Sequence, residues 1–285
     1  TEVATLVGRV KIVKDYEPNE NVWLSWAADV NNTGSIMAYI VKSEPLENWV
    51  EDDFCQDLII SCNGADCIYA NPDSSYMFYP ENISPFGMVQ EVSGLELLNT
   101  SKVINMSNAF RYFSNNSIAN IETLDLSTFD TSNVTNMSSM FSGCGAKYIN
   151  LSTFDTSKVK NMNNMFRETQ NLEEIDLSGF NTESLTNMYA MFYATGAKRI
   201  NLTGFNTENV TNMQYAFSTR NDARILLTEL DLTSFNTSKV TKMDYMFMYM
   251  SKLTSIKVNS ELWKTSNATT TNMFYKCGTS AVTYV

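Results

Sequence analysis

The sequence predicts an α/β repeat solenoid, with one short parallel strand and one short helix in each coil and a β-rich cap at the N-terminal end. Two observations predict this fold. A motif of about 26 residues recurs five times between residues 121 and 247. Within each copy the spacing of apolar residues changes from strand-like to helix-like. The chain has 285 residues, 44% of them hydrophobic, which is enough for one long shared core.

The repeat follows the pattern φ-x-x-φ-[DN]-L-[ST]-x-F-[DN]-T-x-x-φ-x-x-M-x-x-[MA]-F, where φ is apolar. Successive copies of its first phenylalanine are 25, 26, 25 and 30 residues apart. The longer last step indicates an insertion at residues 219–224. Degenerate copies begin near Leu98 and Leu253, and residues 281–285 are expected to form one more strand. The aligned phenylalanines are Phe129, Phe154, Phe180, Phe205 and Phe235.

The first half of each copy predicts a strand. In the third copy Leu172, Ile175 and Leu177 occupy positions 1, 4 and 6, which is the L-x-x-L-x-L spacing of leucine-rich repeats. The predicted fold is therefore a right-handed, leucine-rich-repeat-like solenoid.

The second half of each copy predicts a helix of about two turns. Leu185, Met188, Met191 and Phe192 lie at i, i+3, i+6 and i+7, which places them on one helix face. Thr182 lies just before this run, and threonine is favoured at a helix start.

Charge alternates along one column of the predicted stack. Glu122, Lys147, Glu173 and Lys198 follow one another at the second position of successive copies. Coils that stack in register would therefore place opposite charges side by side, which stabilises neighbouring strands. The structural unit in the middle of the array is expected to be a pair of coils, 51 residues long.

Three domains are expected: an N-terminal cap or small β-rich domain at 1–70, an entry coil at 71–94 and the solenoid at 95–285. Alternating apolar residues predict strands at 3–12 and 35–41. A cap that covers the first coil and an independent binding domain remain open alternatives. Cys62 and Cys67 could form a disulfide or stay free thiols, and the five cysteines are too few for a disulfide scaffold.

The strand half supplies the first candidate site. Polar residues between two inward-pointing core positions must point outward, so they form a stripe on the concave face. The stripe could bind a glycan or a peptide, or be a solvated ladder that satisfies its own hydrogen bonds. Its residues are Asp125, Asn150, Asp176, Asn201 and Asp231.

The second candidate site is an aromatic patch on the predicted helical face, outside the apolar core positions. It could contact a protein partner, or cover the insertion or the cap. Its residues are Tyr189, Tyr193, Tyr215, Tyr245 and Tyr249.

Composition disfavours several functions. Lysine and arginine number 20 against 31 aspartate and glutamate residues, and a net charge of −11 argues against nucleic acid as a partner. No histidine is present, which excludes Ser-His-Asp and Cys-His catalysis. No cofactor or metal motif is found, and we expect no enzymatic activity, no cofactor and no metal site. The longest apolar run has six residues, Ile36–Val41, against about 20 needed to span a bilayer, so no membrane insertion of this segment is expected.

The run FDTSNVTNMSSMFSGC, from Phe129 to Cys144, resembles the repeat signature of bacterial surface proteins grouped as the BspA-like leucine-rich-repeat family. The resemblance covers about residues 95–285, and ANPDSSYMF at 70–78 resembles the usual lead-in. It implies an extracellular protein of the bacterial cell surface, anchored outside this segment, that adheres to or recognises a protein or glycan of a host or neighbouring cell. The alternative is a carbohydrate-binding or envelope scaffold module. The sequence gives no indication of oligomeric state.

Overall fold

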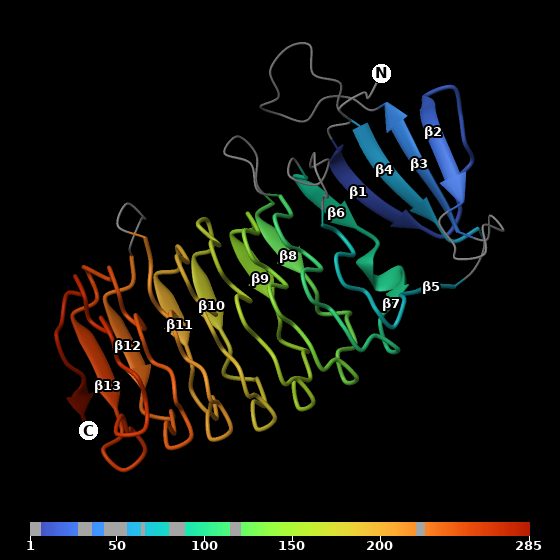
Figure 1. Cartoon of the computed structure of the whole chain (residues 1–285). Helices are drawn as coiled ribbons and strands as arrows, with labels where there is room; N and C mark the ends of the chain where they lie inside the picture. Colours follow the sequence, from blue (N-terminus) through green and yellow to red (C-terminus); the bar gives the residue numbers. More distant parts are fainter. Residues whose placement is uncertain are drawn as a thin grey trace.

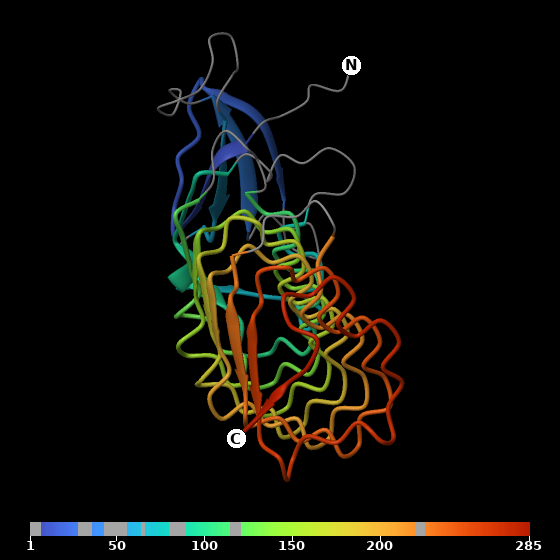
Figure 2. The same cartoon turned by 90° about the vertical axis from the view of Figure 1, so that its left-hand side faces the viewer.

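The N-terminal β-sheet and a long stack of coils make up this protein (Figure 1). The structure is a computed structural model that describes residues 7–27, 36–42, 56–63, 66–79, 89–114, 121–220 and 226–285. Cys55, the acidic stretch at 44–53 and most of the insertion at 219–224 lie outside the described residues. In a view along the stack, the coils overlie one another, with strands on one side and turns on the other (Figure 2).

The N-terminal sheet has five strands in the order β2-β3-β4-β1-β6. β1 is parallel to β4 and β6, whereas β3 is antiparallel to β2 and β4. The strands predicted at 3–12 and 35–41 correspond to β1 and β3. The bounds are β1 Val7–Val13, β2 Val22–Ala27, β3 Met37–Lys42, β4 Gln56–Ser61 and β6 Glu91–Ser93.

One face of this sheet continues the core of the coils. Val10, Ile12 and Leu58 are buried in the same apolar cluster that runs along the whole stack. On the opposite face, Asp57 is buried between Arg9 and Lys11, at 2.7 and 2.9 Å. The sheet therefore covers the apolar end of the first coil, which would otherwise be exposed.

Each coil contributes one short strand to the strand face, which we define as the surface carried by β8 to β13. All described pairings within the stack are parallel. The bounds are β5 Ile68–Tyr69, β7 Leu98–Asn99, β8 Thr123–Asp125, β9 Tyr148–Asn150, β10 Glu174–Asp176, β11 Arg199–Asn201, β12 Glu229–Leu232, β13 Ser255–Val258 and β14 Thr283–Tyr284.

The strands of the stack do not form one sheet. β8 pairs with β9, β10 pairs with β11, and β12 to β14 form a third group. Lys147 bonds to Glu122 at 3.0 Å and Lys198 bonds to Glu173, so the predicted alternation of charge joins the same coils that pair as strands. The four strands from β8 to β11 are thus arranged in the pairs of coils that the sequence predicts.

The prediction of a helix in each coil is wrong. The described residues contain one helical element, the 3-10 turn η2 at Leu95–Leu97, and no α-helix. The second half of each coil is a run of turns, and two residues four apart in most coils have positive φ, such as Ala190 at 50° and Ala194 at 54°. A left-handed residue ends an α-helix, because its carbonyl no longer points along the helix axis. The fold is therefore a stack of strands and turns, not an α/β solenoid.

Hydrogen bonds to the next coil replace the missing helical bonds. In the third copy the N–H groups alternate: Met191 donates to Met188 of its own coil, whereas Phe192 donates to Ala216 of the next coil at 2.8 Å. The buried methionines and phenylalanines keep the predicted inward positions. Their rings stack from coil to coil, as between Phe166 and Phe192 with centroids 5.9 Å apart.

Threonine and asparagine columns complete the stack. The buried hydroxyl of Thr182, which the sequence indicated as a helix start, donates to the carbonyl of Asn206 in the next coil at 2.9 Å. The asparagines before the core methionines form a row of parallel bridges from Asn105 to Asn212, which Asp73 continues at one end and Lys242 and Thr269 at the other. Their side-chain oxygens accept a backbone N–H two residues on, as Asn187 does from Tyr189 at 3.0 Å. Local turns and contacts between coils thus share the same residues.

Candidate functional site

The predicted polar stripe lies on the strand face and is organised in pairs. Asn150 donates to Asp125 at 2.8 Å, and Asn201 donates to Asp176 at 3.0 Å. Asp231 begins the next group of strands and faces Lys257. The stripe is therefore partly a self-satisfying ladder, as one of the two sequence alternatives expected, and it is interrupted wherever two strands do not pair.

Hydrogen bonds keep the stripe carboxylates charged. The backbone N–H of Ser178 donates to Asp176 and lowers the pKa of that carboxyl. The backbone N–H of Ser127 lowers the pKa of Asp125 in the same way. For Asp231 the largest cause of a lowered pKa is the hydroxyl of Thr233. These groups are acceptors at neutral pH.

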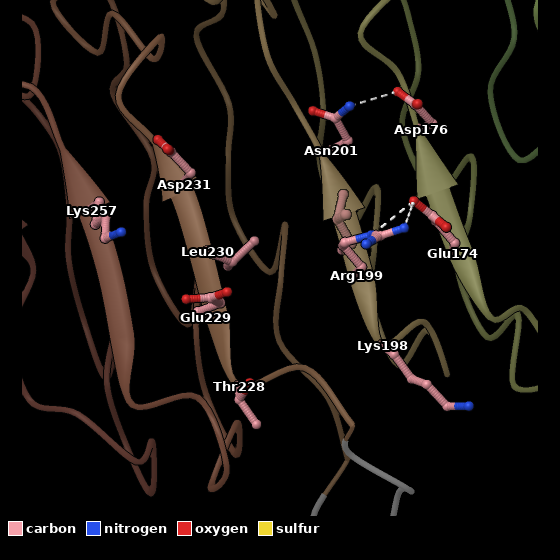
Figure 3. Close-up of a pocket in the computed structure, with 11 residues that line it drawn as sticks. Glu174, Asp176, Lys198, Arg199, Asn201, Thr228, Glu229, Leu230, Asp231 and Lys257 are labelled. Atoms are coloured by element: carbon pink, nitrogen blue, oxygen red, sulfur yellow. Dashed lines mark hydrogen bonds and ion pairs between the residues drawn. The ribbon is translucent and has the colours of Figure 1, made fainter.

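A groove opens between β11 and β12, where the strands are not paired (Figure 3). Its volume is about 560 Å³. Arg199 and Asn201 line one side, and Glu229 and Asp231 line the other, with Lys257 beyond them (Figure 3). We call this the β11–β12 groove.

Ion pairs fix the basic side of the β11–β12 groove. The guanidinium of Arg199 contacts the Glu174 carboxylate at 2.6 and 2.8 Å through two different nitrogens. Exposed pairs of this kind contribute at most about 1 kcal/mol, so they orient side chains more than they stabilise the fold. The groove therefore presents both basic hydrogen-bond donors and acidic acceptors.

A second groove, which we call the β9–β10 groove, lies where β9 and β10 are not paired. Its volume is about 380 Å³. Tyr148 and Asn150 come from β9, and Glu174 and Asp176 from β10. Two carboxylates of β10 line both grooves: Asp176 of the stripe, and Glu174.

Four of the five tyrosines of the predicted aromatic patch lie together, on turns and not on helices. Tyr215 stacks on Tyr245 with centroids 4.8 Å apart and contacts Tyr189 and Tyr193 edge-on. Tyr249 lies apart from this cluster, against Tyr275 and beneath Lys276. All five patch tyrosines are half-buried. Burial raises the pKa of Tyr215 and of Tyr193.

Cys62 and Cys67 are free thiols, and Cys62 is buried. Burial, and then the charge of Cys67, raises the pKa of the Cys62 thiol. Of the two sequence alternatives the structure contains the free form. No group of three or more metal-ligating side chains occurs among the described residues. Within the same part of the chain, no helix has the length and hydrophobicity to cross a bilayer.

Sequence reasoning found the stripe but missed the grooves. Lys198, Lys257 and Gly179 line them, and none was singled out as a site residue. One signal was available: the step of 30 residues between the fourth and fifth copies marks the junction where β11 and β12 separate.

The fold and these grooves define a class: a repeat protein of stacked strand-and-turn coils, closed at one end by a β-sheet. The family model described as "Mycoplasma protein of unknown function, DUF285" matches residues 111–230 and 196–281. These two matches together cover more than half of the chain, and the chain belongs to this family. No curated protein and no solved structure matches the chain.

The family match agrees with the coarse part of the resemblance, a bacterial protein of the surface type whose function is unknown. It does not confirm membership of the BspA-like leucine-rich-repeat family, and the absence of α-helices from the described coils departs from that fold.

Proposed function

We propose that this chain is a non-enzymatic recognition module of the bacterial cell surface, which adheres to a partner on a host or neighbouring cell through its strand face. The observation that carries the proposal is the β11–β12 groove. It exposes charges of both signs in a cavity of about 560 Å³, within the range of ligand-binding clefts.

The ionised state of the stripe carboxylates supports a role in binding over one in catalysis. A carboxyl that acts as a general acid near neutral pH needs a raised pKa. The pKa values of Asp125, Asp176 and Asp231 are lowered instead, by hydrogen bonds from neighbouring N–H and hydroxyl groups. Such carboxylates are suited to accept hydrogen bonds from a partner.

A charge reversal in the groove tests the proposal. Fluorescently labelled intact chain is added to cultured epithelial cells and to bacterial cells, and bound protein is measured by flow cytometry. Lys257→Glu should weaken binding about tenfold, the effect of losing one contact of about 1.4 kcal/mol. Lys257 lies on β13 and is exposed in the groove.

The matched control is Lys239→Glu. Lys239 is equally an exposed lysine, with one hydrogen bond to Asn209 at 2.7 Å, and it does not line either groove. It should bind like the wild type. Equal binding by both variants, or no binding of the wild type to either cell type, would contradict the proposal.

A further inference from the structure

The β9–β10 groove is lined by an exposed aromatic ring, by planar polar side chains and by apolar side chains, and from this we propose that it is a saccharide subsite. The inference rests on the proposed function for the face that it uses, and it names the ligand: a neutral sugar unit whose apolar ring face stacks on Tyr148. Its geometry, polarity and charge each support this ligand class.

The aromatic platform is Tyr148. It stands on β9 with 43% of its surface exposed, although it is a large apolar side chain. Lys147 lies 5.6 Å from the ring centroid and is bonded to Glu122 of the preceding coil, so this contact restrains the ring from the side of β8. A restrained, exposed ring offers a large contact area at low cost in conformational entropy.

Part of the groove lining is apolar. Phe180 is 6% exposed, Leu151 is buried and Ile149 is half-buried. Polar side chains line the same groove, so a ligand there would meet both carbon atoms and hydrogen-bonding groups. Pockets that combine apolar surface with a few polar groups bind small organic ligands.

Hydrogen-bonding capacity remains at the groove edge. Asp176 accepts from Ser178 and from Asn201 through the same oxygen, Oδ1. Its Oδ2 is then left for a ligand hydroxyl or for the hydroxyl of Ser178. Asn150 uses one N–H toward Asp125, and its amide has a second N–H. A carboxylate and an amide that line the same groove match the hydroxyl groups of a sugar, which both donate and accept.

Charge in the groove favours a neutral ligand. Glu174 and Asp176 both line it, and Arg199 neutralises Glu174 through contacts of 2.6 and 2.8 Å, so the net charge of the groove comes mainly from Asp176. The lowered pKa of Asp176 keeps that carboxylate ionised at neutral pH. This negative charge favours a neutral polyhydroxyl ring over an acidic sugar or a phosphate.

A glycine opens the groove. Gly179 lies at its edge, and a Cβ atom added there would meet nothing within 4 Å. The first and second copies carry Thr128 and Thr153 at the equivalent position. A side chain introduced at Gly179 would therefore start in open space at the edge of the groove, which provides a variant that crowds the site without a clash at its Cβ.

The test is isothermal titration of the intact chain with short neutral oligosaccharides, namely cello-, xylo-, malto- and chito-oligosaccharides. We expect at least one series to bind. Tyr148→Ala should weaken that binding at least tenfold, and Tyr148→Phe, which keeps the ring, should restore it to within about threefold. Gly179→Leu should also weaken binding at least tenfold.

The matched control is Tyr275→Ala, which removes a tyrosine of similar exposure, 47%, that lines neither groove. It should bind as the wild type does. Binding of none of the four series, binding only of acidic sugars, or equal binding by Tyr148→Ala would overturn the saccharide subsite. Loss of cell binding in Lys257→Glu together with no sugar binding would overturn the subsite alone and leave the proposed function standing.

Discussion

Thr182 shows how a single side chain can hold two coils together. Its hydroxyl donates to the Asn206 carbonyl at 2.9 Å and accepts the Asn206 N–H at 2.8 Å, while the side chain is 2% exposed. Thr100, Thr131, Thr156 and Thr207 donate in the same way to the coil that follows each of them. The hydroxyl thus connects backbone groups that no strand pairing reaches.

Thr182→Val should therefore lower the free energy of unfolding by about 2–4 kcal/mol, because the part-buried N–H and C=O of Asn206 each lose a partner, at about 1–2 kcal/mol apiece. Urea denaturation followed by circular dichroism measures the change. Thr186→Val is the control, since Thr186 is exposed and donates only to Lys160; it should change stability by less than about 0.5 kcal/mol. Similar losses in both variants would contradict the role of the buried hydroxyl.

Acid should destabilise the fold through its turn aspartates. The hydroxyl and backbone N–H of Ser132 lower the pKa of Asp130, and those of Ser157 lower the pKa of Asp155. A pKa below the unfolded value of about 3.9 stabilises the fold above that pH, and the stabilisation is lost as pH falls through the folded pKa. The free energy of unfolding should hence fall below about pH 4. With no histidine in the chain, no group of that type titrates between pH 5 and 8.

The double variant Asp130→Asn, Asp155→Asn tests this assignment. Asparagine already occupies the same position at Asn181, Asn206 and Asn236, where its oxygen accepts the equivalent N–H. The variant should be as stable as the wild type at pH 7 and should lose less stability between pH 5 and pH 3, as measured by thermal melts. Identical losses would show that other groups dominate acid unfolding.

At the scale of the element, the apolar pattern predicted which residues are buried but not the backbone that buries them. Leu185, Met188, Met191 and Phe192 are all in the core, as their spacing indicated. A helix and a run of tight turns both place residues i, i+3 and i+7 inward, so this pattern alone cannot separate them. The local sequence carried the distinction: the second halves are rich in asparagine, serine and threonine, which favour turns over helices.

Ser139→Gly distinguishes the turn from a helix by the sign of its effect. Ser139 has φ of 55°, a left-handed conformation that costs an L-residue about 1 kcal/mol and glycine almost nothing. Glycine also adds entropy to the unfolded chain, which offsets part of this gain. The variant should therefore be as stable as the wild type, or more stable by up to about 0.5 kcal/mol. Chemical denaturation provides the measurement.

Ser138→Gly, one residue earlier and equally half-buried, is the control, because Ser138 is not among the residues with positive φ. It should lose about 0.5–1 kcal/mol. In a helix both glycines would destabilise to a similar extent, so equal losses would contradict the turn assignment.

At the scale of the whole molecule, the repeat could be predicted from the sequence and the grooves could not. Register follows from the Phe, Met and Asn columns, each of which recurs at a nearly constant step. The separation of β9 from β10 and of β11 from β12 depends on which neighbours pair more strongly, a balance of several weak contacts. The alternating charges indicated the pair of coils and the 30-residue step marked the β11–β12 junction, yet no motif shows that an unpaired junction forms a cavity.

A stack built from pairs of coils should tolerate the loss of a pair better than the loss of one coil. Deleting residues 146–196 removes 51 residues and places Glu122 beside Lys198 and Ile121 beside Ala197, as in the intact array. Deleting residues 146–171 removes only 26 residues, but it places Glu122 beside Glu173 and Ile121 beside Leu172. Two large buried side chains then meet where a large and a small one packed before.

The shorter deletion should consequently be less stable than the longer one, by about 1–3 kcal/mol. Overpacking costs about 1–3 kcal/mol, and opposed like charges add a few tenths of a kcal/mol. Adding Ile121→Ala and Glu122→Lys to the single-coil deletion restores the alternation of small with large and of basic with acidic residues. These substitutions should recover most of the difference in the free energy of unfolding, as measured by urea denaturation. If the single-coil deletion is the more stable chain, or if the two substitutions leave it unchanged, single coils and not pairs are the units of the stack.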